Sequence, residues 1–124
     1  FHPTYGVLWD DHIEFELRPT EDNSIGFVWG LYKWIINPTN ASADQHWSQN
    51  GGEGLGWSSK ATIRSNVSAT AWTLEMAIPL SSLIHGAYAE RNESGQPRVT
   101  LPIADGTAYR AWFGRGIGGG IRQS

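Results

Sequence analysis

Residues 71–83 read AWTLEMAIPLSSL and contain the longest unbroken period of two in the chain. A strand that buries only one of its faces has this period. Pro79 ends the strand because proline has no N–H to donate to a sheet, and 81–83 is predicted as a short helical turn. Such a strand needs other strands beside it. The residues predicted to face inward are Trp72, Leu74, Met76 and Ile78.

Length and composition limit the kinds of protein that this chain can be. It has 124 residues, 40% of them hydrophobic and 17% charged, which predicts one globular domain over 1–124, with 115–124 as a flexible tail. The net charge of −3 argues against nucleic acid or an anionic membrane as a partner. No apolar run reaches the roughly 20 residues that span a bilayer. The chain begins with Phe rather than Met, and we interpret it as a mature or excised product.

Further short strands are predicted on both sides of the first stretch. In 12–17, Ile13, Phe15 and Leu17 are expected to face inward, and 26–36 is apolar on both faces, which predicts a central strand with a bulge or close approach at Gly30. Residues 39–56 are predicted to be an irregular loop. The remaining strands are expected at 57–66, 98–103 and 107–115, with turns at 66–70 and 105–106. This pattern predicts an all-β protein, an antiparallel sandwich or barrel.

Two compositional features suggest an extracellular sugar-binding protein. The chain has seven Trp, too many for a small domain to bury completely, and an exposed indole can stack on the flat face of a sugar ring. Three N-x-S sequons begin at Asn40, Asn66 and Asn92, which predicts a secreted glycoprotein; coincidence in a chain rich in Ser and Asn is the alternative. Cysteine is absent, so disulfides and thiolate metal sites are excluded.

Three segments together resemble one family. WDDHIEFELRP (9–19), WTLEMAIPLSSL (72–83) and DGTAYRAWFGR (105–115) are similar, in the same order, to strands of family 9 carbohydrate-binding modules and their DOMON-like relatives. The resemblance covers most of the chain and implies a jelly-roll-like β-sandwich. The chain departs from the family in having only a few residues, rather than further strands, ahead of its first segment. A missing edge strand would invite pairing with another chain, in a homo-oligomer or with a strand-donating partner.

The resemblance also implies a function and a site. These domains bind carbohydrate without cleaving it, so we expect a β-glucan or xylan chain end to be held between Trp9 and Trp112. Glu14 and Arg115 match polar groups of the family site. Lys33 either points toward the ligand or is a snorkelling surface lysine. The chain is then expected to be a module of a secreted protein, such as a glycoside hydrolase.

The family often carries structural calcium, to which Asp10 and Asp11 could contribute oxygen ligands. Two adjacent acids are far fewer than a calcium loop supplies, and no cofactor is predicted beyond this. The four histidines lack metal-ligand spacing and are predicted to be surface residues, although His46 lies in the long loop and stands apart. Glu75 is expected to pair with Arg64 or Arg110 if both faces of its strand are covered.

Each candidate has an alternative interpretation. Trp9 and Trp112 could be core or edge-packing aromatics, and Glu14 and Glu16 could lie on a solvated face. Catalysis is not expected, because no motif fixes two carboxylates at a glycosidase separation and no nucleophile motif is present. Some DOMON-like domains bind haem through Met, but Met76 is predicted to be a core residue. A structural component of an extracellular surface or fibre is the remaining alternative.

Overall fold

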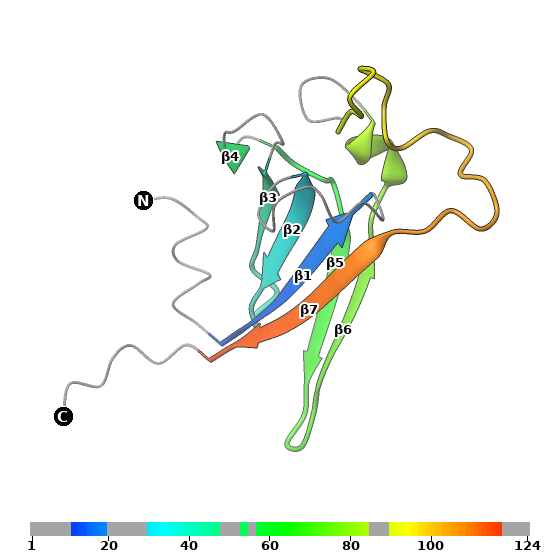
Figure 1. Ribbon diagram of the computed structural model, residues 1–124. Helices are drawn as coiled ribbons and strands as arrows, with labels where there is room; N and C mark the ends of the chain where they lie inside the picture. Colours follow the sequence, from blue (N-terminus) through cyan, green and yellow to red (C-terminus); the bar gives the residue numbers. More distant parts are fainter. Residues whose placement is uncertain (1–10, 20–29, 48–52, 55–56, 85–89, 118–124) are drawn as a thin grey trace.

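The computed structural model describes residues 11–19, 30–47, 53–54, 57–84 and 90–117. Its strands pair in antiparallel fashion and form a five-stranded sheet of order β4-β3-β2-β1-β7 and a separate β5-β6 hairpin (Figure 1). The all-β, antiparallel prediction is therefore confirmed. The elements are β1 (His12–Arg18), β2 (Leu31–Ile36), β3 (Ser42–Trp47), β4 (Glu53–Gly54), β5 (Thr62–Val67), β6 (Trp72–Ala77), the 3-10 helix η1 (Leu80–Leu83) and β7 (Arg110–Gly116).

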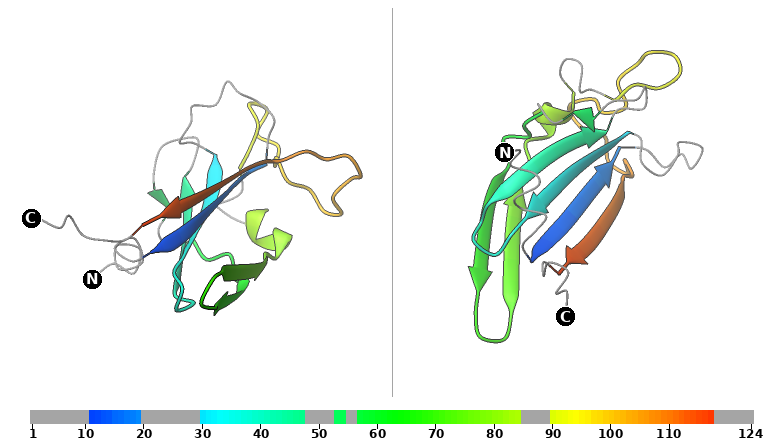
Figure 2. Two further views of the ribbon diagram at one scale, coloured as in Figure 1. Left: turned by 90° about the horizontal axis from the view of Figure 1, so that it is seen from below. Right: turned by 90° about the vertical axis from the view of Figure 1, so that its left-hand side faces the viewer.

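The hairpin lies against one face of the five-stranded sheet, as the views of Figure 2 show. A buried cluster joins the two layers: Ile63 of β5 packs with Trp34 and Ile36 of β2, and Leu74 and Met76 of β6 border it. We call the sheet face that meets the hairpin the inner face and the opposite face the outer face. The jelly-roll-like sandwich implied by the resemblance stays a prediction.

The strand predicted ahead of Pro79 forms as expected. In β6 every second side chain is half-buried and the residues between are exposed, which is the period of a strand with one buried face. The strand ends at Ala77, two residues before Pro79, and η1 begins directly after the proline. Ala61, Ile63 and Ser65 face inward as predicted, although β5 itself begins only at Thr62.

β2 is the middle strand of the five-stranded sheet, so its apolar character on both faces indicated its position correctly. Its inner-face residues Tyr32, Trp34 and Ile36 are fully buried, and so is Ile35 on the outer face. Gly30, just before the strand, has a φ of 72° and donates a backbone hydrogen bond of 2.6 Å to Trp47. This left-handed conformation favours glycine and accounts for the irregularity expected there.

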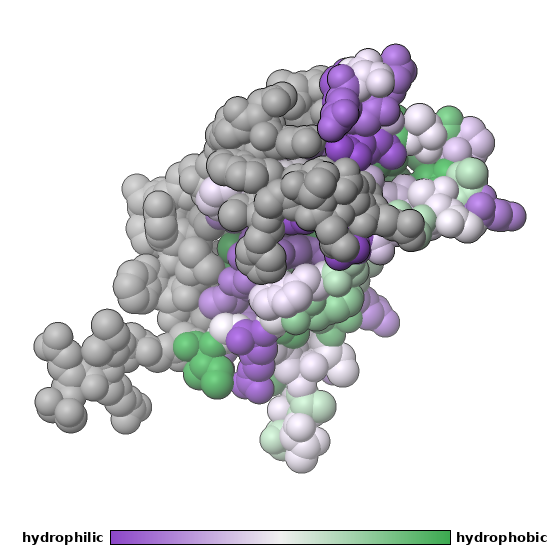
Figure 3. Space-filling view, viewed as in Figure 1, coloured by the Kyte–Doolittle hydropathy of each residue, from purple (hydrophilic) through white to green (hydrophobic). Residues whose placement is uncertain are grey.

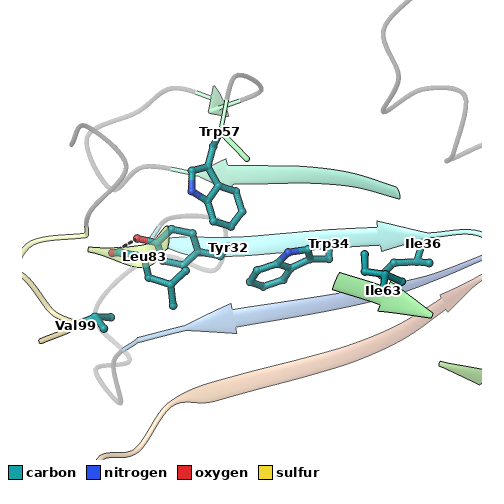
Figure 4. Packing of buried hydrophobic residues seen from close by; sticks show 7 residues of the cluster. All are labelled: Tyr32, Trp34, Ile36, Trp57, Ile63, Leu83 and Val99. Carbon is teal, nitrogen blue, oxygen red and sulfur yellow. Dashed lines mark hydrogen bonds between the residues drawn. The ribbon is translucent and has the colours of Figure 1, made fainter. Parts of the chain in front are cut away.

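The core is built around the aromatic rings of β2 and of Trp57, which precedes β5 (Figure 4). Trp34 packs edge-on against Trp57, with ring centroids 5.5 Å apart, and the Tyr32 hydroxyl donates to the Leu83 carbonyl at 3.1 Å. Because buried polar groups are costly unless they are hydrogen-bonded, the second contact ties η1 to β2. The buried cluster is Tyr32, Trp34, Ile36, Trp57, Ile63, Leu83 and Val99.

Two predicted elements are wrong. The loop expected over 39–56 contains β3, whose polar sequence SADQHW hides its period; Asp44 replaces an apolar inner-face residue and accepts hydrogen bonds from the backbone and hydroxyl of Ser59. Residues 98–103 form no strand, because Pro102 interrupts the N–H donors that a ladder needs. Val99 packs into the core from this irregular segment. The last strand begins at Arg110 instead of Thr107.

Candidate functional site

A row of polar and aromatic side chains crosses four strands on the outer face. The strand registers pair Gln45 of β3 with Lys33 of β2, Lys33 with Glu16 of β1, and Glu16 with Trp112 of β7. Residues paired across antiparallel strands share a face, so these four lie side by side. We call them the polar row. Its members become more exposed toward β7, from the buried Gln45 to Trp112, which is 47% exposed.

One ammonium group organises the middle of the polar row. The Lys33 Nζ lies 2.8 Å from Oε2 of Glu14 and 3.3 Å from Oε1 of Glu16. The His12 Nε2 lies 3.2 Å from the other oxygen of Glu14. The three charged side chains of the Lys33 pairs are only 18–20% exposed, so their positions are more restricted than those of a free surface charge. The row thus holds charged donor and acceptor groups in fixed places.

Trp112 forms the outer end of the row. Its indole lies over Gly114 of the same strand, where a β-carbon would collide with the ring. Glycine at that position therefore lets the indole lie close to the sheet. A concavity of about 270 Å³ adjoins the indole, and Figure 3 shows hydrophilic and hydrophobic side chains side by side in the region of β1 and β7. The concavity is lined by Glu16, Arg18, Leu31, Arg110, Ala111 and Trp112.

The structure brings together three of the five predicted sugar-binding residues. Glu14, Lys33 and Trp112 share the outer face. Arg115 does not, because it pairs with Ile13 on the inner side of the sheet, and its assignment to the same cluster was wrong. Successive side chains of a strand point to opposite faces, so residues whose numbers differ by an odd number lie on opposite faces. Trp112 and Arg115 of β7 differ by three and therefore point in opposite directions. Trp9 lies outside the described residues.

Two arginines take the place expected for Arg115. Arg18 and Arg110 pair across β1 and β7 and line the concavity beside Trp112. Sequence reasoning did not assign them to the site, since they belong to distant segments and only the strand register brings them together. A period-two reading of β7 would have placed Arg110, rather than Arg115, on the Trp112 face.

The predicted calcium ligands do not form a recognisable site in the described part of the chain. Asp11 is half-buried, and its carboxylate lies 4.0 Å from the guanidinium of Arg115. Asp10 lies outside the described residues. Among the residues described, no three His, Asp or Glu side chains come together as metal ligands would. Calcium binding stays a prediction.

The three sequon asparagines are all exposed. Asn40 lies in the turn between β2 and β3, Asn66 in β5 and Asn92 in the turn before Gly95. Exposure is what a glycan requires of its acceptor. The geometry is therefore compatible with modification at Asn40, Asn66 and Asn92, while occupancy stays a prediction.

Two histidines predicted to be surface residues are buried. His46 is 2% exposed, and its Nε2 lies 2.6 Å from Oε1 of Glu90, which is 3% exposed. The ring also stacks on Tyr32, at 4.7 Å between centroids. His12 is 6% exposed, and its ring covers Gly116. His2 and His85 lie outside the described residues.

The buried histidine belongs to a structural network, not to an accessible site. The Tyr32 hydroxyl accepts a hydrogen bond from the Glu90 backbone N–H at 3.2 Å while it donates to Leu83. Burial raises the pKa of the Tyr32 phenol well above its ordinary value and outweighs the hydrogen bond from the Glu90 backbone N–H, which lowers the pKa. These bonds connect the residue 90 segment to β2 and β3.

The remaining candidates have structural positions. Glu75 is exposed on β6, directly across from Arg64 on the uncovered face of the hairpin, so Arg64 is its neighbour among the two predicted partners. Met76 packs against the buried core cluster.

No family model, curated protein or solved structure matches this chain. Within the part of the chain that the structure describes, no helix has both the length and the apolar character that a membrane crossing needs.

Proposed function

We propose that this protein binds the ends of β-glucan or xylan-type chains, without cleaving them, on the outer face of its five-stranded sheet. The observation that carries the proposal is the half-exposed indole of Trp112, which lies over Gly114 beside a concavity with charged walls. A flat apolar ring next to hydrogen-bonding groups is the combination that a sugar ring needs, since its C–H face stacks and its hydroxyls both donate and accept.

The walls of the concavity supply both kinds of hydrogen-bonding group. The Glu16 carboxylate is an acceptor, and the guanidinium groups of Arg18 and Arg110 are donors with a fixed fork geometry. Hydrogen bonds that involve a charged partner are stronger than neutral ones. Lys33 holds Glu16 from the side of β2, so the acceptor is oriented before a ligand arrives.

The absence of cleavage is part of the proposal. A glycosidase places the sugar, or a water, between two carboxyl groups. Here Glu14 and Glu16 instead share one ammonium group, which occupies the space between them. We therefore assign the two carboxylates to positioning and binding.

The proposed setting is extracellular. Exposed acceptor asparagines at Asn40, Asn66 and Asn92 support it. Calcium at Asp11, haem at Met76 and a parent glycoside hydrolase have no comparable support in the described geometry, and none of them is needed for the proposed binding.

The test is an isothermal titration of the protein with soluble β-glucan and xylan oligosaccharides. A stacked ring is worth on the order of 1–3 kcal/mol, by analogy with base stacking, so Trp112→Ala should weaken binding by about 5- to 150-fold. Phe113→Ala is the matched control, because Phe113 is an exposed aromatic of the same strand on the opposite face. Phe113→Ala should bind short oligosaccharides as the wild type does.

The arginines give a second, independent contrast. Arg110→Ala should weaken binding because it removes a donor from the concavity, while Arg115→Ala should leave binding unchanged. Equal losses of affinity in the two arginine variants, or an unchanged affinity in Trp112→Ala, would contradict a binding site on the outer face.

A further inference from the structure

β7 has only one strand partner among the described residues. It pairs along its whole length with β1, and it ends the order of the five-stranded sheet. Figure 2 shows it at the rim of the sheet. A strand at such an edge presents every second N–H and C=O outward, ready to pair with another strand.

A line of stacked aromatic rings ends at this edge on the inner face. Trp34 stacks on Phe15 at 5.4 Å and Phe15 stacks on Phe113 at 4.8 Å, measured between ring centroids. Phe113, the last ring, is 72% exposed. An aromatic ring from a further strand could stack on the exposed side of Phe113 and continue the line.

The sequence of β7 is complementary to itself. Antiparallel pairing of all seven residues, RAWFGRG, with a second copy is possible in only one register, which places Phe113 opposite Phe113. In that register Arg110 is opposite Gly116, and Arg115 is opposite Ala111. Like charges directly opposite each other destabilise a strand pair, and this register has none. The large Trp112 is opposite Gly114, which leaves room for its ring.

We propose that two copies of this protein pair through their β7 edges in an antiparallel, two-fold symmetric dimer centred on Phe113. The two five-stranded sheets then become one continuous sheet, and the line of stacked rings continues from Phe113 into its counterpart. Such an interface is isologous, with the same residues contributed by both subunits. Because seven residues per copy bury a small area, the association is weak, and its Kd is micromolar or higher.

The dimer has a consequence for sugar binding, and this consequence alone rests on the proposed function. A two-fold axis perpendicular to the sheet keeps both outer faces on one side, so the two Trp112 residues occupy diagonal positions with Cα atoms roughly 7–8 Å apart. The second copy then contributes the second indole of the site. Longer oligosaccharides should gain more affinity from the dimer than short ones do.

Disulfide cross-linking tests the register directly, because the chain has no cysteine of its own. The variant Phe113→Cys places one thiol opposite its counterpart, within disulfide distance, and should cross-link rapidly on mild oxidation. Ala111→Cys alone should cross-link slowly, since the two thiols of the dimer would lie far apart along the strands. A mixture of Ala111→Cys and Arg115→Cys should form the heterodimer. Equal rates at all positions would overturn the register.

Sedimentation velocity over a range of concentrations tests the association itself. The wild type should shift from monomer toward dimer, and Phe113→Glu should remain monomeric, because it places two carboxylates opposite each other. Thr62→Glu is the control, since Thr62 is exposed on the face of the hairpin that points away from the sheet, and it should associate like the wild type. A wild type that stays monomeric at millimolar concentration would overturn the dimer and leave the edge to a strand of another protein.

The experiments distinguish a failure of the proposed dimer from a failure of the proposed sugar site. Cross-linking and sedimentation need no sugar, so a positive result there stands even if no oligosaccharide binds. If sugars bind and the oxidised and reduced forms of Phe113→Cys have equal affinity for long oligosaccharides, the shared site is excluded while the proposed function remains.

Discussion

The two faces of the five-stranded sheet are built from neighbouring residues of the same strands, yet they have different roles. The polar row of the outer face is Gln45, Lys33, Glu16 and Trp112. The row directly behind it, shifted by one residue in each strand, is Asp44, Trp34, Phe15 and Phe113. On the inner face Trp34 belongs to the core and Phe15 packs against it, although Phe113 at the sheet edge is exposed. The outer row carries paired charges and an exposed indole.

The comparison shows that burial, more than residue type, assigns the roles. Both faces contain a tryptophan and a basic–acidic contact. On the inner face Trp34 is fully buried, and the His46–Glu90 pair is almost completely excluded from water. On the outer face Trp112 and the Lys33 pairs remain accessible in part. The inner groups should therefore determine stability and the outer groups binding.

The two tryptophans should give the largest contrast. Trp34→Ala removes a buried ring and its hydrogen bond to the Ser59 hydroxyl, and it should lower the free energy of unfolding by about 4 kcal/mol. Trp112→Ala should change it by no more than about 0.5 kcal/mol. Urea denaturation followed by circular dichroism measures both. A similar loss in the two variants would contradict the division between the faces.

The buried contact between His46 and Glu90 is the next target. Glu90→Ala leaves the His46 ring without its partner in the core, so the free energy of unfolding should fall by about 3 kcal/mol. Glu93→Ala, an exposed carboxylate in the same segment, is the matched control and should stay within about 0.5 kcal/mol of the wild type. The same urea titration decides between the two.

Alkaline pH should reveal the buried phenol of Tyr32. In the unfolded chain this group loses its proton near its ordinary pKa of 10.0, while burial raises the pKa in the folded state. The folded protein then holds more protons than the unfolded one above pH 10.0, so the stabilising contribution, complete below that pH, is lost as the pH rises further. Each pH unit should cost up to about 1.4 kcal/mol.

Tyr32→Phe should reduce this alkaline loss. A smaller part should persist, because burial also raises the pKa of Tyr109. Unfolding measured between pH 8 and pH 11 tests the assignment, with Tyr109→Phe as the comparison. If Tyr32→Phe and the wild type lost stability in parallel, the phenol would not be the source.

The smallest effect is expected on the outer face. Lys33→Met removes the ammonium shared by Glu14 and Glu16 and leaves two neighbouring carboxylates, so stability should fall by about 1 kcal/mol. Because the pairs are partly exposed, salt should reduce the difference between Lys33→Met and the wild type. Thermal unfolding at low and high salt measures it. A difference that is insensitive to salt would indicate a packing role for the Lys33 stem.

The sequence predicted what depends on local periodicity. The alternation of β6, its end just before Pro79 and the central position of β2 follow from patterns within a few residues. β3 was missed because Asp44 and His46 stand where apolar residues would have shown the period. Their partners, Ser59 and Glu90, lie far away in the chain, and no local pattern shows that such residues meet.

The candidate site was predicted only in part, because its residues come from distant segments and no local pattern shows that they meet. Trp112, Glu14 and Lys33 share the outer face. The family resemblance supplied Trp112 and Glu14, and Lys33 was chosen because it is a charged residue among apolar ones on a central strand. Arg115 was placed on the wrong face, although alternation within β7 was sufficient to exclude it. Arg18 entered the site only through the β1–β7 register, which joins opposite ends of the chain.

NMR of the tryptophan indole N–H groups, during titration with a xylan or β-glucan oligosaccharide, tests the central claim most directly. The Trp112 signal should move in a saturable way. The signals of Trp34 and Trp57, whose N–H groups are hydrogen-bonded in and around the core, should stay in place. An unmoved Trp112 signal in a titration where another indole responds, or no response to any sugar, would contradict the assignment of binding to the outer face.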